Sequence, residues 1–137
     1  MNEEAAIRGP SLGEFAAVWI GGGLGALLRY TLVLAWPADL GAWPWHTFVA
    51  NLLACAVLAF AIAHRENGWG SDRRLTLIGS GFCGGLSTFS ALQLEVYQLF
   101  DAGRDLLALA YFGASVAAGV AVVTFVRRFI ARGEDVA

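Results

Sequence analysis

Four long runs without a charged side chain constrain this sequence more than any other feature. Residues 40–63, 75–94 and 106–126 contain no Asp, Glu, Lys or Arg, and residues 15–36 contain only Arg29. About 20 apolar residues in an α-helix cross the hydrocarbon core of a bilayer. The runs therefore predict an all-α membrane protein with four transmembrane helices, which we place at residues 15–36, 43–64, 75–99 and 106–127.

The composition agrees with this interpretation. Of the 137 residues, 58% are hydrophobic and 15% are charged, whereas about 25% of the residues in a typical soluble domain are charged. The segments between the four predicted spans are too short to fold on their own. We therefore expect residues 1–137 to form a single membrane domain, without a soluble module.

The first span follows an acidic segment, which distinguishes it from a secretory signal peptide. Glu3, Glu4 and Glu14 precede the apolar run or lie at its start. A signal peptide would have a basic leader and a small-residue cleavage site instead. We expect this span to remain in the protein. The two cysteines, Cys55 and Cys83, lie inside predicted spans without metal-ligand spacing, so we expect them to be small buried apolar residues.

The arginines are distributed unevenly between the two sides of the predicted membrane. If the chain crosses four times, seven arginines lie on the side of the two termini and only Arg104 lies on the other side, outside the helices. The seven are Arg8, Arg65, Arg73, Arg74, Arg127, Arg128 and Arg132. By the positive-inside rule, both termini are predicted to be cytoplasmic in a multi-pass protein of the cell (plasma or inner) membrane. Trp36, Trp43 and Trp45 fall at the opposite interface, where an aromatic belt is expected.

Polar side chains recur at helical spacing in the second and fourth spans. Thr47 and Asn51 are four residues apart and share one helix face, as do Tyr111 and Ser115. A buried amide such as Asn51 needs a partner on a neighbouring helix or in a hydrated cavity. Such polar lines either hold helices together or form the wall of a polar path, and spacing alone does not separate the two.

The third span contains the least helix-like sequence of the chain. Gly84 and Gly85 lie at its centre and are followed by Ser87 and Thr88. Glycine costs about 1 kcal/mol relative to alanine in a helix, so we expect the helix to unwind within residues 84–88, near the bilayer midplane. Unwound backbone in a membrane is tolerated where it is buried in protein or binds an ion. The alternative is a continuous helix with a glycine-lined crossing.

Four segments in order resemble the signatures of one membrane protein family. They are GGGLGALLRY in the first span, HTFVANLLA in the second, GFCGGLSTFSAL in the third and YFGASVAAG in the fourth. Together they are similar to the Fluc (CrcB-type) fluoride channels over residues 20–120. The resemblance implies a four-helix subunit that assembles as an antiparallel dimer. It also implies passive export of fluoride from the cytoplasm, which protects the cell from this ion.

The resemblance also implies roles for individual residues. Backbone carbonyls at Gly84 and Ser87 would hold a structural sodium ion at the dimer centre. The ring edge of Phe89 would attract fluoride, because the edge of a phenyl ring is positive. Hydrogen-bond donors along the pore would replace part of the water shell of the ion. These donors would come from Asn51, Thr47, Ser90, Tyr111 and Ser115. Arg29 would attract anions in an aqueous vestibule, or else snorkel to the interface.

The sequence departs from the family pattern at four positions. Leu92 occupies the place of the second pore phenylalanine, and Ala91 occupies the place of a threonine. Ala54 and His46 stand where the family has glycine. Leucine has no aromatic quadrupole, so we expect at least one of the two pores of a symmetric dimer to be impaired.

The arginine bias and the Leu92 position together favour a heterodimer. A chain that forms an antiparallel homodimer must insert in both directions, which a ratio of seven arginines to one opposes. We therefore hypothesise that this chain pairs with a homologous subunit of opposite orientation, with one working pore between the two.

One alternative to a conducting subunit remains open, and three other classes are disfavoured. A proton-coupled multidrug exporter of this size needs a carboxylate embedded in its first span, and none lies there beyond Glu14. A non-conducting structural subunit is compatible with Leu92. An enzyme is not expected because no nucleophile–base pair, metal cluster or phosphate loop is visible. The nine basic residues are too scattered for a nucleic-acid partner.

Overall fold

The computed structural model describes residues 11–37, 39, 41–66, 68 and 71–134, apart from the side chains of 72 and 132–134. These residues form helices and connecting segments, with no strand among them. Four helical segments are long and apolar enough to cross a membrane: Leu12–Ala35, Trp45–Glu66, Arg73–Asp101 and Asp105–Ala131. The prediction of an all-helical chain with four such segments is confirmed. Glu3, Glu4 and Arg8 lie outside the described residues.

The first span is helix α1 (Leu12–Ala35), and its start is fixed by a capping box. The Ser11 hydroxyl accepts a hydrogen bond from the Glu14 N–H at 3.3 Å, and the Ser11 N–H donates to the Glu14 carboxylate at 2.7 Å. These bonds satisfy backbone groups that have no partner within the first turn. The second span is α2 (Trp45–Glu66), which begins directly after Pro44.

The third span consists of four consecutive helical pieces. They are α3 (Asp72–Leu75), the π-helix η2 (Thr76–Cys83), α4 (Gly84–Leu86) and α5 (Phe89–Asp101). Ser87 and Thr88 separate α4 from α5 in extended backbone, with ψ of 152° and 118° respectively. They lie near the middle of the Arg73–Asp101 segment. The fourth span is α6 (Asp105–Glu134).

Gly84 and Gly85 themselves remain helical, and the interruption within residues 84–88 falls on Ser87 and Thr88. Gly84 has helical dihedral angles, and Gly85 continues α4. Gly85 is needed for close packing instead, because a Cβ atom there would lie 2.2 Å from the Gly22 carbonyl oxygen of α1. Gly21 and Gly25 meet the backbone of the third span in the same way. The glycine-lined crossing is thus present at Gly85. The backbone becomes extended two residues later, at Ser87.

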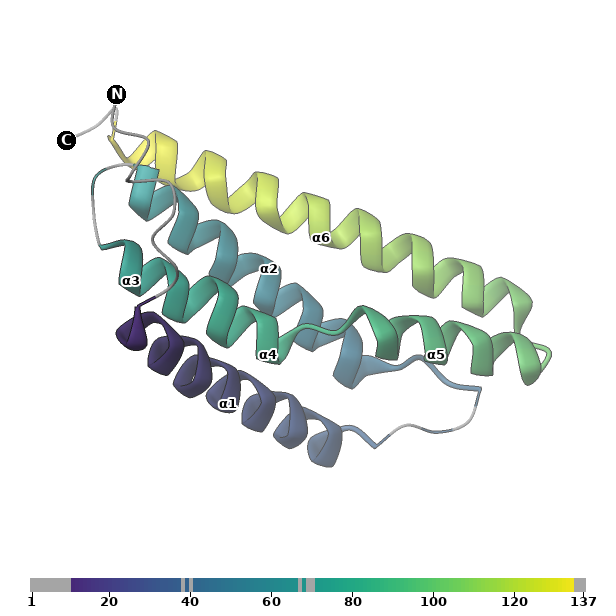
Figure 1. Ribbon diagram of the computed structural model, residues 1–137. Helices are drawn as coiled ribbons and strands as arrows, with labels where there is room; N and C mark the ends of the chain where they lie inside the picture. The colour runs from purple at the N-terminus through teal and green to yellow at the C-terminus, as the bar shows by residue number, and fades with distance from the viewer. Residues whose placement is uncertain (1–10, 38, 40, 67, 69–70, 135–137) are drawn as a thin grey trace, which may run out of the picture.

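The four spans do not close into a symmetrical bundle. Helix α1 packs against η2 and α4, whereas α6 packs against α2 and α5. Within the described part of the chain, α1 contacts neither α5 nor α6, and the ribbon of α1 diverges from that of α5 (Figure 1). The start of α1, the end of α2, the start of α3 and the end of α6 lie at one end of the bundle. The open side therefore lies beside the Ser87–Thr88 interruption.

Candidate functional site: an interrupted helix beside a polar cleft

Asn51 of α2 holds the interrupted backbone in place. Its side-chain N–H donates to the Thr88 carbonyl oxygen at 3.2 Å, and its side-chain oxygen accepts from the Thr88 N–H at 2.8 Å. The Thr88 hydroxyl accepts from the Ala91 N–H and so caps the start of α5. The partner that a buried amide requires is therefore backbone of the third span. An amide carries two N–H donors, and this pairing uses one of them.

The interruption also removes the α-helical partner of a carbonyl group. In a continuous α-helix the Thr88 N–H would donate to the Gly84 carbonyl oxygen, but here it donates to Asn51. Gly84 is exposed. The side chain and N–H of Ser87 instead turn back to the Cys83 carbonyl, at 2.8 and 2.9 Å. A carbonyl oxygen at Gly84 suits a hard cation such as sodium, which breaks in membrane helices coordinate.

A buried carboxylate, Glu95 of α5, gathers three polar side chains one to two turns beyond the interruption. Thr47 donates its hydroxyl hydrogen to one carboxylate oxygen at 2.5 Å, and Tyr111 donates to the other at 2.6 Å. His46 Nε2 lies 3.1 Å from the oxygen that Thr47 binds. Glu95 is only 8% exposed and Tyr111 is fully buried. A hydroxyl has one hydrogen to donate, so Thr47 and Tyr111 direct theirs to Glu95 in this arrangement.

The sequence analysis did not identify Glu95 as a site residue. Its signal was its position: it is the first charged residue after residues 75–94, seven residues beyond Thr88 and therefore near the same helix face. A carboxylate at that depth is costly without hydrogen-bond donors. Two of the hydroxyl groups singled out from their spacing are those donors.

A cleft of about 270 Å³ connects this cluster to the interruption. It opens where α1 diverges from α5, and its polar lining consists of Arg29, Tyr30, His46, Thr47, Thr88 and Glu95. Arg29, expected in a vestibule, thus lines a polar cavity together with Thr47. The cleft joins an arginine, a carboxylate and the extended backbone within one space.

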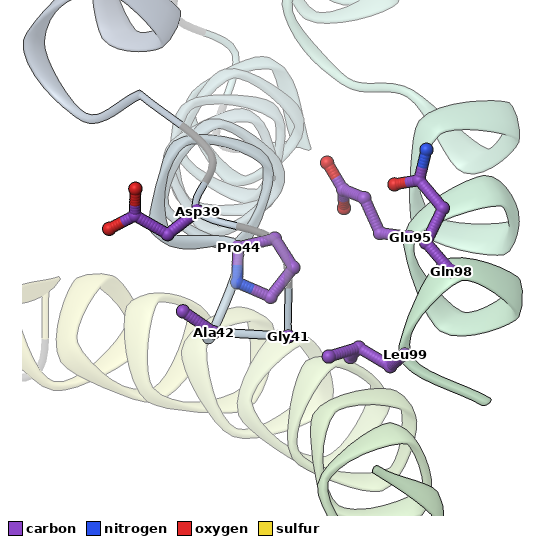
Figure 2. Close-up of a pocket in the computed structure, with 7 residues that line it drawn as sticks. All are labelled: Asp39, Gly41, Ala42, Pro44, Glu95, Gln98 and Leu99. Carbon is purple, nitrogen blue, oxygen red and sulfur yellow. The ribbon is translucent and has the colours of Figure 1, made fainter. Parts of the chain in front are cut away.

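A second, smaller cavity lies on the other side of Glu95. Its volume is about 30 Å³, which is enough for a water molecule. Glu95 and Gln98 project from α5 toward the segment that carries Gly41 and Pro44, while the carboxylate of Asp39 points away (Figure 2). Glu95 therefore borders two cavities, one facing the 39–44 segment and one facing the Thr88 backbone.

The remaining candidate residues divide between the surface and the core of the subunit. Phe89 is 64% exposed, and Ser90 beside it is exposed, with its hydroxyl 3.2 Å from that of Thr88. Leu92, only three residues later, is 6% exposed and packs with Ala108 and Tyr111. The hydroxyl of Ser115 donates to the Tyr111 carbonyl of its own helix. The structure therefore brings together Arg29, Thr47 and Thr88 around the cleft, with Asn51 bonded to the Thr88 backbone, but leaves Phe89 on the outside of the single chain.

Comparison with known proteins gives consistent matches. Residues 16–126 match the family described as CrcB-like protein, Camphor Resistance (CrcB). The chain is 37% identical over 102 residues to the fluoride-specific ion channel FluC 2 of Streptomyces avermitilis, covering 74% of this chain and 65% of that protein. It is 40% identical over 108 residues to FluC 2 of Nocardia farcinica, covering 78% and 77% of the two chains. It is 37% identical over 120 residues to FluC 1 of Mycolicibacterium paratuberculosis, covering 87% and 91%. The chain therefore belongs to the CrcB-like family, which includes proteins named fluoride-specific ion channels.

Proposed function

We propose that this multi-pass membrane protein is a subunit of a fluoride channel that lets fluoride leave the cytoplasm passively. The observation that carries the proposal is the Asn51–Thr88 pairing, which keeps an extended segment of backbone beside a cleft lined by Arg29. The likeness to fluoride-specific ion channels supports fluoride as the ion. The match covers 65% of the length of the Streptomyces avermitilis protein.

The proposed path uses weak, repeated interactions rather than one tight site. Arg29 attracts the anion into the cleft, and the second N–H of Asn51 replaces part of its hydration shell. Ser90 and Ser115 add hydroxyl groups on either side. Thr47 and Tyr111 complete the wall while they hold Glu95. Conduction requires that each contact be strong enough to admit the ion and weak enough to release it.

A second subunit completes the proposed pore. Phe89 is 64% exposed, so its ring is largely uncovered by the described part of its own chain. The positive edge of the ring attracts an anion only when the ring lines the path. An antiparallel dimer would bring a second copy, or a homologous chain, against this surface. Gly84 and Ser87 from the two subunits would then offer backbone oxygens to one structural sodium ion at the dimer centre.

The proposed orientation places both chain termini in the cytoplasm. The end of the bundle that carries the start of α1 and the end of α6 also carries Arg65, Arg73, Arg74, Arg127 and Arg128. The other end carries Arg104. The positive-inside rule assigns the arginine-rich end to the cytoplasm. This bias supports pairing with a subunit of opposite orientation.

Fluoride efflux from liposomes tests the proposal. The purified chain is reconstituted into liposomes, either alone or together with a homologous subunit of opposite arginine bias. The liposomes are loaded with potassium fluoride, and fluoride efflux is followed with a fluoride electrode. We expect efflux that is much faster than in protein-free liposomes, together with no comparable chloride efflux. Efflux seen only with the partner would assign conduction to the heterodimer. If neither preparation released fluoride faster than bare lipid, the channel function would be rejected.

A further inference from the structure

His46 adds a second titratable side chain to the Glu95 cluster. Its Nε2 atom lies 3.1 Å from Glu95 Oε1, and the two side chains are 11% and 10% exposed. An ionised carboxylate only accepts hydrogen bonds, so Nε2 carries a hydrogen in this contact. His46 Nδ1 is buried and has no hydrogen-bond partner among the described residues. A proton can therefore be added at Nδ1 without disturbing the contact between Nε2 and Glu95.

The charges around His46 make its protonation consequential for an anion. From α5, Glu95 contributes a negative charge, and from α1, Arg29 contributes a positive one and Tyr30 a neutral phenol. From α6, Tyr111 binds Glu95 with its hydroxyl. Asp39 lines the small cavity on the far side of Glu95. With a neutral imidazole, the carboxylate offsets the attraction of Arg29 for an anion. A protonated imidazole cancels the carboxylate and leaves Arg29 unopposed.

We propose that His46 is a charge-compensating residue of the anion path, whose protonation neutralises Glu95 and so increases fluoride binding and conduction as the pH falls. This inference rests on the proposed fluoride function. His46 acts through Glu95, so it positions charge and does not itself need to touch the ion. Because binding and protonation are linked, fluoride must in turn favour protonation of His46.

The chain offers a matched pair of histidines for the test, because His46 and His64 are its only two. His64 is exposed at the other end of α2 and stacks on Phe60 with ring centroids 4.9 Å apart. His46→Gln and His46→Asn keep a side-chain N–H donor but cannot take up a proton. His64→Gln is the control. Fluoride efflux is measured from about pH 8 to about pH 5, where histidine changes its charge, and the leak of protein-free liposomes is subtracted at each pH.

We expect efflux of the unmodified protein and of His64→Gln to rise by about fivefold or more across this range, and that of both His46 variants to stay flat. An equal rise in His46→Gln and in the unmodified protein would overturn the role of His46 while leaving the channel function intact. No fluoride efflux in any variant at any pH would overturn the channel function, and this inference with it.

A binding measurement checks the same linkage without conduction. Sodium fluoride is added to weakly buffered protein in detergent, and the change in pH is recorded against sodium chloride. We expect fluoride to draw up to about one proton per subunit from solution in the unmodified protein and in His64→Gln. The His46 variants should take up none beyond the blank. Equal uptake by His46→Gln would contradict the proposal.

Discussion

At the scale of single residues, the site depends on two polar side chains, Asn51 and Glu95, each of which bonds to groups on neighbouring helices. Asn51 uses both ends of its amide on the Thr88 backbone, and Glu95 accepts from Thr47 and Tyr111 while it contacts His46. Buried polar groups of this kind are stable only when all members are satisfied. Loss of one member therefore leaves the other buried groups without their hydrogen-bond partner, which lowers the stability of the fold.

Replacement of Glu95 by alanine should strongly destabilise the subunit. The change leaves the Thr47 and Tyr111 hydroxyls and His46 without their acceptor, and breaking a buried charged cluster costs about 3–5 kcal/mol. Glu66→Ala is the matched control, since Glu66 forms a 3.0 Å ion pair with Arg127 in which both side chains are about half exposed. Such surface pairs contribute about 0–1 kcal/mol. Unfolding of the purified variants in detergent measures the loss of stability in Glu95→Ala and in Glu66→Ala. Equal stability of the two variants would contradict the role of Glu95 as the acceptor of a buried polar cluster.

At the scale of helices, the fold depends on glycines that let α1 approach the third span. A Cβ atom at Gly25 would lie 2.1 Å from the Phe82 carbonyl oxygen, and one at Gly21 would lie 2.3 Å from that of Leu77. Real atoms do not approach so closely, so a side chain at either position must push the helices apart. The same contact surface positions the end of α1, and therefore Arg29, at the cleft.

Gly25→Ala and Gly23→Ala provide a paired test within one helix. A Cβ atom at Gly23 meets no atom within 4 Å, so that variant should be neutral or more stable by up to about 1 kcal/mol, because alanine favours helix. Gly25→Ala should destabilise by about 1–3 kcal/mol or more through overpacking. Thermal unfolding in detergent compares the two. If they unfolded alike, the close crossing would not hold in the membrane protein.

The helices could be predicted from the sequence more fully than the break. An uncharged run predicts a membrane helix because each apolar side chain contributes independently to the free energy of insertion into the bilayer. Residues 40–63 and 106–126 therefore suffice to predict two of the spans. The fate of Gly84 and Gly85 depends on what lies opposite them, and the sequence does not show that Gly22 packs there. Asn51 was recognised as needing a partner, but its pairing with Thr88 joins residues 37 positions apart. The roles of Glu95 and His46 arise from the same long-range contacts.

At the scale of the whole molecule, the single chain leaves part of its third span uncovered. The third span exposes Gly84, Phe89 and Ser90, whereas polar groups and a broken backbone need cover within a bilayer. A second subunit provides that cover in the proposed dimer. The arginine distribution then decides which kind of partner fits.

Reporter fusions test the orientation that the heterodimer requires. A reporter fused after Ala137, which lies outside the described residues, should show a single cytoplasmic location, because a bias of seven arginines to one directs insertion. Arg73→Ser and Arg74→Ser together leave a bias of five arginines to one, so that variant should keep the same single orientation. A mixture already in the unmodified protein would favour a homodimer instead.

Removal of sodium tests the central cation proposed for the dimer. Protein prepared throughout in N-methylglucamine should lose fluoride efflux and dissociate into monomers, because a ligand bound only to the assembled state stabilises that state. Parallel preparations in sodium and in potassium salts of equal ionic strength separate a specific effect from ionic strength. Unchanged efflux and assembly without sodium would contradict a structural role for the ion.

The most direct measurement of the central claim is fluoride efflux through Asn51→Ala, reconstituted with the same partner as the unmodified chain. Asn51 both holds the Thr88 backbone and offers an N–H to the ion, so its loss should lower efflux by about tenfold or more, equivalent to about 1.4 kcal/mol. Thr124→Ala, which removes a hydroxyl bonded only within α6 at the Val120 carbonyl, should conduct normally. Equal efflux from a folded Asn51→Ala and the unmodified protein would show that the interrupted helix is not part of the path.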